Sequence, residues 1–192
     1  MSAPDVPAIP VRLARRPVIG GLVVPWITAR TPDGRYRFGH VDYTRHLQAL
    51  HDRLCQTCGG PLDPTRIVFA MRDSDLRVFI SHEPGMHPVC AAYSATGCPM
   101  LAGRMSHYRT TPLAAHLADL GVSSHGDPTD TRPAAPAERW NVLWATDYRI
   151  TTHPLTGQPA ALVLPEQILR TRPINPAAPP ADTADPTPTP NA

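Results

Sequence analysis

The sequence of 192 residues contains no lysine, so all eighteen of its basic side chains are arginine. A GC-rich coding genome is the simpler explanation, although arginine is also well suited to binding phosphate and carboxylate. Residues 1–112 hold thirteen Arg against eight Asp and Glu, and residues 113–192 hold five against eight. Dedicated duplex-binding proteins carry a much denser basic stripe, so this asymmetry permits an anionic partner without requiring one.

Long hydrophobic runs are also missing. The longest candidate, residues 18–29, is interrupted by Gly20, Gly21 and Pro25 and is shorter than the ~18 residues that a membrane span needs. The first residues, with Asp5 among several prolines, lack the basic-then-apolar order of a secretory signal. These absences predict a cytoplasmic protein that has no membrane partner.

Several catalytic and cofactor motifs are absent. There is no Gly-rich phosphate loop, no G-x-S-x-G elbow and no pair of carboxylates at a recognisable spacing. The stretch H-E-P-G-M-H at residues 82–87 does not fit the metalloprotease helix, since its histidines are five residues apart and P-G breaks a helix. The order of the zinc deaminase motif is not present either. We therefore expect no nucleotide cofactor and assign no catalytic residues.

Proline, in contrast, is abundant, with 25 residues placed unevenly along the chain. Segments dominated by Pro, Ala, Thr and Asp cannot bury enough apolar surface to fold. The composition predicts five divisions: a flexible arm (1–16), a zinc-binding α+β domain (17–126, with a finger at 54–98), a Pro-rich linker (127–138), a β-hairpin segment that packs on the domain (139–172) and a disordered tail (173–192).

Local patterns predict β-hairpins and short helices within these divisions, hence an α+β fold class. The turn T-P-D-G at residues 31–34 predicts a hairpin over residues 18–38, and Asp42 is expected to cap a helix that reaches Leu54. Further patterns predict a hairpin of strands 66–71 and 77–80, a helix over residues 88–97 with Pro88 in its first turn, a short helix over residues 112–120, and a hairpin of strands 140–152 and 159–164.

The four cysteines predict a metal site. They lie within 44 residues, as Cys55-Gln-Thr-Cys58-Gly-Gly and, further on, His87-Pro-Val-Cys90 and Cys98-Pro. A C-x-x-C pair offers two thiolates from one tight turn, and an H-x-x-C pair opening a helix offers two more donors. Clustered cysteines in a chain of this length suit a metal site in a reducing compartment better than a disulfide scaffold.

We assign Cys55, Cys58, His87 and Cys90 as the ligands of one structural Zn²⁺ ion. The alternative replaces His87 by Cys98, but eight residues of helix separate Cys90 from Cys98 by ~12 Å, too far for one ion unless the helix stops early. A site without metal is the third possibility. Four protein ligands complete a tetrahedron and leave no position for an activated water, so such an ion stabilises structure.

The order of these ligands resembles the treble-clef class of zinc fingers over residues 54–98. The segments Cys55-x-x-Cys58-Gly-Gly-Pro-Leu and Glu83-Pro-Gly-Met-His87-Pro-x-Cys90-Ala-x-Tyr93, together with Cys98-Pro-Met-Leu, are similar to a group of small actinobacterial and actinophage proteins. That similarity extends from residue 17 to about residue 172. It implies a cytoplasmic zinc protein from a mobile-element or specialised-metabolism neighbourhood, and it implies no particular activity.

The sequence leaves the partner open between protein and nucleic acid. Five arginines near the finger are candidates for anion binding, although solvated surface residues are the simpler interpretation: Arg35, Arg37, Arg45, Arg104 and Arg109. We favour a non-catalytic zinc-finger protein that presents a binding surface as an accessory or regulatory factor. The alternative is an enzyme, nuclease-like or small-molecule-modifying, with a structural zinc; a pocket joining His82, His107 and Arg104 would favour it.

Overall fold

The computed structural model describes residues 7–108 and 134–174, which form an α+β fold of small antiparallel sheets and few helices. No helix in these two ranges is long and apolar enough to cross a membrane. The elements are η1 (Val11–Leu13), β1 (Val18–Ile19), β2 (Leu22–Val23), β3 (Thr28–Arg30), β4 (Tyr36–Val41), α1 (Tyr43–His51), β5 (Ile67–Arg72), α2 (Asp73–Leu76), β6 (Ile80–Ser81), α3 (Pro88–Gly97), β7 (Trp140–Ala145), β8 (Arg149–Thr152), β9 (Pro159–Leu162), η3 (Pro165–Gln167) and β10 (Ile168–Pro173).

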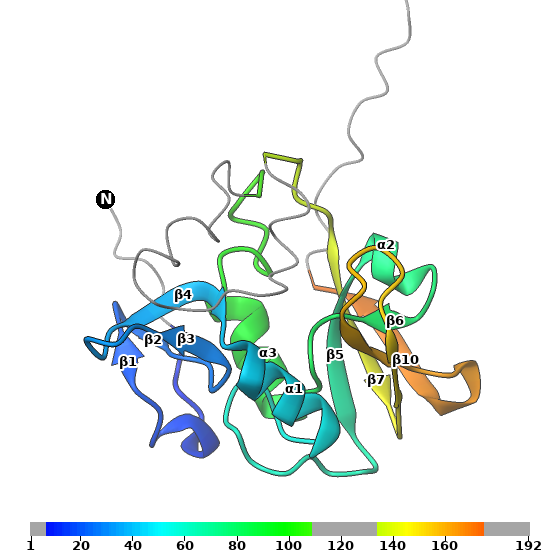
Figure 1. Cartoon of the computed structure of the whole chain (residues 1–192), viewed down its shortest axis with the longest axis horizontal. Coiled ribbons are helices and arrows are strands. Elements are labelled where there is room, and N and C mark those ends of the chain that lie inside the picture. The colour runs from blue at the N-terminus through cyan, green and yellow to red at the C-terminus, as the bar shows by residue number, and fades with distance from the viewer. Residues whose placement is uncertain (1–6, 109–133, 175–192) are drawn as a thin grey trace, which may run out of the picture.

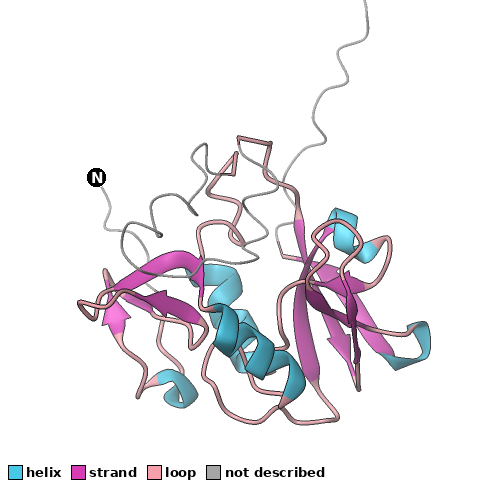
Figure 2. Ribbon diagram, in the orientation of Figure 1, coloured by secondary structure: helices cyan, strands magenta, loops and turns pink. Residues whose placement is uncertain are grey.

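Helices α1 and α3 lie in the middle of the molecule (Figure 1). Strands β1 to β4 stand on one side of the helices, and the sheets formed by β5 to β10 stand on the other (Figure 2). The segment that carries the predicted ligands runs between these two sides, so its loops contact both. This placement makes the metal-site region the junction of the fold.

The N-terminal part forms two hairpins where the sequence predicted one. Strands β1 and β2 pair around Gly20 and Gly21, whose φ angles are 57° and 80°. Positive φ at both central positions is the turn geometry that matches the twist of two short strands, and paired glycines adopt it without steric cost. Strands β3 and β4 pair antiparallel around the predicted turn at residues 31–34, which confirms that hairpin.

The predicted flexible arm of residues 1–16 differs from the structure in its second half. Residues 11–13 form η1, and the side chain of Leu13 is fully buried in the core. Arg16 holds the following turn, because its guanidinium donates to the carbonyl oxygens of Val24 (3.1 Å) and Pro25 (3.3 Å). A single leucine among prolines and arginines is too weak a signal for sequence analysis, yet it anchors this segment. Residues 1–6 lie outside the described residues.

Helix α1 begins where the sequence predicts. The Asp42 carboxylate accepts a hydrogen bond from the Arg45 backbone N–H at 3.1 Å, which satisfies one of the donors that a helix start leaves open. The helix ends at His51 rather than at Leu54. Leu54 instead pairs with Pro61 in an isolated β-bridge, which brings the two ends of the C-x-x-C loop together.

The predicted hairpin of strands 66–71 and 77–80 is wrong. Strand β5 pairs with β7, and strand β6 pairs with β9, in two different sheets. Between them the chain forms α2 instead of a hairpin turn, because the Asp75 carboxylate accepts from Nε (2.7 Å) and from one terminal nitrogen (2.6 Å) of Arg72. This buried pair closes a helical turn and directs the chain out of the first sheet.

The C-terminal segment supplies strands to both sheets. Strands β8 and β9 pair antiparallel around residues 153–157, which confirms the last predicted hairpin. The predicted strand 140–152 is two strands, however, since β7 joins β5 and β10 while β8 joins β9. Strand β10 was not predicted. The helix predicted over residues 112–120 lies outside the described residues, as do 127–133 of the predicted linker and 175–192 of the predicted tail.

One hydrophobic core joins the predicted finger and the C-terminal segment. Strand β5 is buried at all six positions, and its pairing with β7 brings Leu143 and Ala145 into the same cluster as Cys55 and Cys90. Gly85, in the loop before α3, also lies close to β5. A Cβ at Gly85 would stand 2.6 Å from Cγ2 of Ile67. The loop before α3 is therefore packed tightly on β5.

Candidate metal centre

A tight loop between α1 and β5 carries the first two ligands. The Cys55 N–H donates to the Gly60 carbonyl at 2.8 Å, and the Gly59 N–H donates to the Cys55 carbonyl at 2.7 Å. Gly59 has φ of 78°, and its α-carbon lies against the indole of Trp26, so that a Cβ would stand 2.6 Å from Cδ1. The positive φ favours glycine at this position, and the contact with Trp26 leaves no room for a side chain.

Helix α3 carries the other two candidate ligands. His87 is the N-cap residue, Pro88 occupies the first position, and Cys90 lies in the first turn. Two backbone hydrogen bonds between Met86 and Val68, at 2.9 and 2.8 Å, tie the start of α3 to β5. A further bond, from the Gln56 N–H to the Gly85 carbonyl at 3.0 Å, joins the two ligand-bearing loops to each other.

The four donor atoms converge. The sulfur atoms of the three cysteines and a ring nitrogen of His87 all lie within 4.8 Å of one another. Cys55 and Cys90 are fully buried and His87 is 5% exposed, while Cys58 is half-buried. Cys55, Cys58, His87 and Cys90, the four residues that the spacing predicted, are therefore positioned to bind one metal ion.

The histidine is oriented by its second nitrogen. Nε2 of His87 lies 2.8 Å from the Pro61 carbonyl oxygen, and Nδ1 lies 3.4 Å from Sγ of Cys58. A carbonyl oxygen only accepts, so Nε2 carries the proton and Nδ1 keeps its lone pair toward the cysteines. Metal-bound histidines have this arrangement, in which a backbone acceptor fixes the tautomer and the ring orientation.

The thiols perturb one another strongly because they are so close. Hydrogen bonds from Cys58 and Cys90 lower the pKa of the Cys55 thiol, and the hydrogen bond to Cys55 raises the pKa of Cys90 and that of Cys58. A hydrogen bond with the sulfur of Cys55 raises the pKa of His87. Three sulfurs this close ionise together only beside a cation, which is the charge that a divalent metal ion supplies.

Cys98 does not belong to this group. It is the residue at which α3 ends, where its N–H donates to the Ser94 carbonyl at 2.9 Å, and it is half-buried. Burial raises the pKa of its thiol. The helix runs its full length between Cys90 and Cys98, so the condition under which Cys98 could replace His87, an early end of the helix, is not met.

The predicted anion-binding arginines are partly engaged within the chain. Arg45 donates to the Trp26 carbonyl at 2.9 Å, and Arg104 donates to the carbonyls of Thr96 (3.1 Å) and Gly97 (3.0 Å) at the end of α3. Arg35 pairs with Asp33 at 3.1 Å on the exposed turn. Arg37 is exposed on β4, and Arg109 lies outside the described residues.

The histidines proposed for an enzyme lie in different surroundings. His82 is buried against the rings of His46 and His153, whereas His107 is exposed beside the hydroxyl of Ser106. Sequence analysis missed the cluster around His82, because its members come from segments far apart along the chain. No local motif could have found it.

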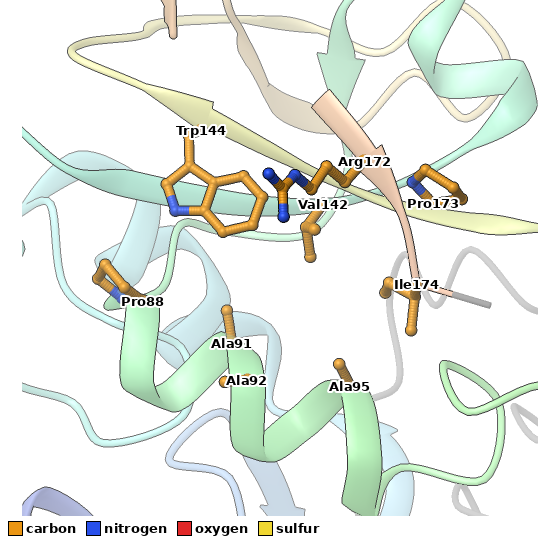
Figure 3. Close-up of a pocket in the computed structure, with 9 residues that line it drawn as sticks. All are labelled: Pro88, Ala91, Ala92, Ala95, Val142, Trp144, Arg172, Pro173 and Ile174. Atoms are coloured by element: carbon orange, nitrogen blue, oxygen red, sulfur yellow. The ribbon is translucent and has the colours of Figure 1, made fainter. Parts of the chain in front are cut away.

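A shallow pocket of about 200 Å³ lies beside the ligand-bearing helix. Figure 3 shows Pro88, Ala91 and Ala95 of α3 facing Val142 and Trp144 of β7 across this pocket. Its walls are mostly apolar, and Arg172 of β10 contributes a positive charge at one side. The residue after Cys90 is thus part of the pocket wall.

Comparison with known proteins adds no relative: no protein-family model, no curated protein and no solved structure matches this chain.

Proposed function

We propose that the four-donor cluster holds one structural Zn²⁺ ion in a treble-clef-like arrangement. Three cysteine sulfurs and one imidazole nitrogen, which here lie within 4.8 Å of one another, are a donor set that zinc binds in closed structural sites. The likeness to a treble clef lies in the two ligand-bearing ends, a glycine-rich loop and the first turn of a helix. The segment between them departs from it, since β5 and β6 do not pair with each other.

We further propose that the zinc organises a surface for binding another protein. One observation carries this proposal: the helix that holds His87 and Cys90 also forms one wall of the pocket in Figure 3. Fixing the first turn of α3 fixes Pro88 and Ala91, and so sets the spacing between α3 and β7. The site would then act on the surface indirectly, as an accessory or regulatory binding module with no chemistry of its own.

A protein partner is favoured over nucleic acid. Apart from Arg172 at one side, the pocket walls are alanine, proline, valine, isoleucine and tryptophan, which suit an apolar side chain or a short peptide. Many arginines are held by internal acceptors, carboxylates or aromatic rings, and so are less available for phosphate: Arg16, Arg30, Arg45, Arg53, Arg72, Arg104, Arg139 and Arg170.

Elemental analysis of protein purified without added metal tests the zinc site. We expect one zinc per chain, loss of far-ultraviolet circular dichroism on chelation, and recovery on adding Zn²⁺ back. Cys58→Ser should lose the metal, while Cys98→Ser serves as the matched control and should keep it. Metal-free protein that remains folded, or retention of zinc by Cys58→Ser together with loss in Cys98→Ser, would overturn the assignment.

Selection from a displayed random-peptide library tests the binding surface. The zinc-loaded chain should enrich peptides with apolar anchors, and Ala95→Arg, which fills the pocket, should abolish that enrichment. Thr96→Arg is the matched control, because Thr96 is exposed on the same helix and does not line the pocket. Binding to DNA or RNA that weakens steeply as salt rises would instead support the nucleic-acid interpretation.

A further inference from the structure

Strand β10 is the outer strand of its sheet, whose order is β10–β7–β5, and no described strand pairs with its other side. The Ile174 N–H donates to the Trp140 carbonyl at 2.9 Å, so by the alternation of an antiparallel pair residues 170 and 172 also bond to β7. Thr171, between them, therefore directs its N–H and C=O away from β7. An unpaired edge of this kind can take up a further strand.

The face of β10 that is turned toward α3 carries two arginines. In the register with β7, Arg170 lies opposite Trp144, and its guanidinium carbon is 3.9 Å from the centre of the Trp144 ring. Arg172 lies opposite Val142, and directly opposite residues share a face of the sheet. Figure 3 shows Val142, Trp144 and Arg172 facing α3 at the pocket. The unpaired edge and the pocket thus adjoin each other.

The two charges select the kind of strand that the edge can accept. Both arginines are exposed, and neither forms an ion pair with a described residue. A second copy of this chain fits poorly, because an antiparallel pairing of two β10 strands about Thr171 would set Arg170 opposite Arg172, and like charges directly opposite destabilise a sheet. A strand with acidic side chains at these positions is complementary instead.

The register of an added strand follows from Thr171. The partner residue opposite Thr171 would exchange backbone hydrogen bonds with it, and its two neighbours would lie opposite Arg170 and Arg172. Side chains two positions apart share a face, so the next partner residue in that row lies opposite Ile174, which lines the pocket. The geometry therefore predicts two acidic residues two positions apart and, two positions further on, an apolar residue.

We propose that the partner supplies an extended acidic segment that adds to β10 as a further strand, with carboxylates at Arg170 and Arg172 and an apolar side chain in the pocket beside Ile174. This inference rests on the proposed protein-binding surface and names what that surface binds. Backbone hydrogen bonds at Thr171 contribute affinity, while the arginines and the pocket select the sequence.

Fluorescence anisotropy of labelled synthetic peptides, mixed with the zinc-loaded full chain, tests the acidic pattern. A peptide with the core Asp-Thr-Asp-Thr-Leu should bind about tenfold more tightly than one with Asn-Thr-Asn-Thr-Leu, and the difference should shrink as salt rises. Arg172→Glu should remove this preference. Arg149→Glu, exposed on β8, is the matched control and should keep it. Equal binding of the two peptides to the unmodified chain would overturn the acidic partner.

A change in the peptide backbone tests strand addition itself. Methylation of the nitrogen of the threonine between the two aspartates removes the N–H that would bond to Thr171, and should weaken binding about tenfold. Methylation of the first aspartate nitrogen, which points away from β10, should not. Thr171→Pro removes the matching donor of the chain, at a position where an edge strand tolerates proline, and should also weaken binding. Equal binding of the two methylated peptides overturns strand addition, whether or not the variant folds.

These results are distinguishable from a failure of the proposed surface. If Ala95→Arg abolishes peptide selection while the acidic and amide peptides bind alike, the pocket still binds a protein and the acidic strand is wrong. If no peptide is enriched and none binds, the proposed surface fails as well. A chain that sediments as a dimer, and as a monomer after Thr171→Pro, would assign the edge to a second copy and overturn the inference.

Discussion

At the scale of single residues, the cysteine loop depends on close packing between Gly59 and Trp26. The positive φ of Gly59 alone would not require a glycine, because other residues tolerate such a conformation at a modest cost. The contact with the indole ring makes the requirement stricter, since a Cβ would overlap Cδ1 and the neighbouring ring atoms. Trp26 lies between β2 and β3, so this contact also joins the two N-terminal hairpins to the cysteine loop.

Replacing Gly59 by alanine tests that requirement. Gly157 is the matched control, since its φ is 67° and a Cβ there would meet nothing within 4 Å. We expect Gly157→Ala to reduce the free energy of unfolding by about 1 kcal/mol, from backbone strain alone. Gly59→Ala should cost more, on the order of 2–4 kcal/mol, because Trp26 must move as well. Equal losses in denaturant titrations of the two variants would show that Trp26 yields freely.

At the scale of elements, α2 decides which strands pair. The ion pair between Arg72 and Asp75 is 3–4% exposed, and it lies at the point where β5 ends. A two-residue turn here would have folded β6 back on β5. Because the helical turn intervenes, β5 remains free to pair with β7.

Asp75→Asn is expected to destabilise the fold by about 3–5 kcal/mol, since it leaves the buried Arg72 charge without its partner. Asp147→Asn is the matched control, because the pair of Asp147 with Arg53 is about half exposed and should be worth less than about 1 kcal/mol. Thermal or denaturant unfolding measures both values. A loss at Asp75 as small as that at Asp147 would mean that Glu138, 3.6 Å from Arg72, replaces the lost carboxylate.

At the scale of the whole molecule, the ligands and the C-terminal strands share one core. Cys55, Cys90 and Leu143 are fully buried members of the same cluster, although the finger and the C-terminal segment lie in different predicted divisions of the chain. Strand β7 is the link, because it pairs with β5 on one side and with β10 on the other.

Amide hydrogen exchange with and without chelator tests this connection. We expect removal of the metal to abolish protection in β7 (Trp140–Ala145) together with protection in α3, because both depend on the packing of β5. Protection of the amides in β8 and β9 shows, in the same experiment, whether the β6–β9–β8 sheet stays folded. Amides of β7 that stay protected after chelation, while those of α3 exchange freely, would show that the finger unfolds as an independent unit.

Local signals in the sequence predicted the features that depend on neighbouring residues. The spacing of the cysteines and His87, the proline at the start of α3 and the cap at Asp42 act within a few residues, so they carry nearly the same meaning in any fold. The turn at residues 31–34 was predicted for the same reason. These signals suffice to predict the four residues that are positioned to bind a metal ion and most of the element positions.

Tertiary structure alone decided which strands pair and which polar residues meet. A strand pattern does not specify its partner, so β5 could be assigned to the nearer β6 until the buried Arg72 and Asp75 pair redirected the chain. Burial of Leu13 and the gathering of the three histidines likewise depend on contacts between segments that are distant in sequence. The sequence by itself determined where a metal ion can bind, whereas only the packing of α3 on β5 placed Pro88, Ala91 and Ala95 across a pocket from Val142 and Trp144 of β7.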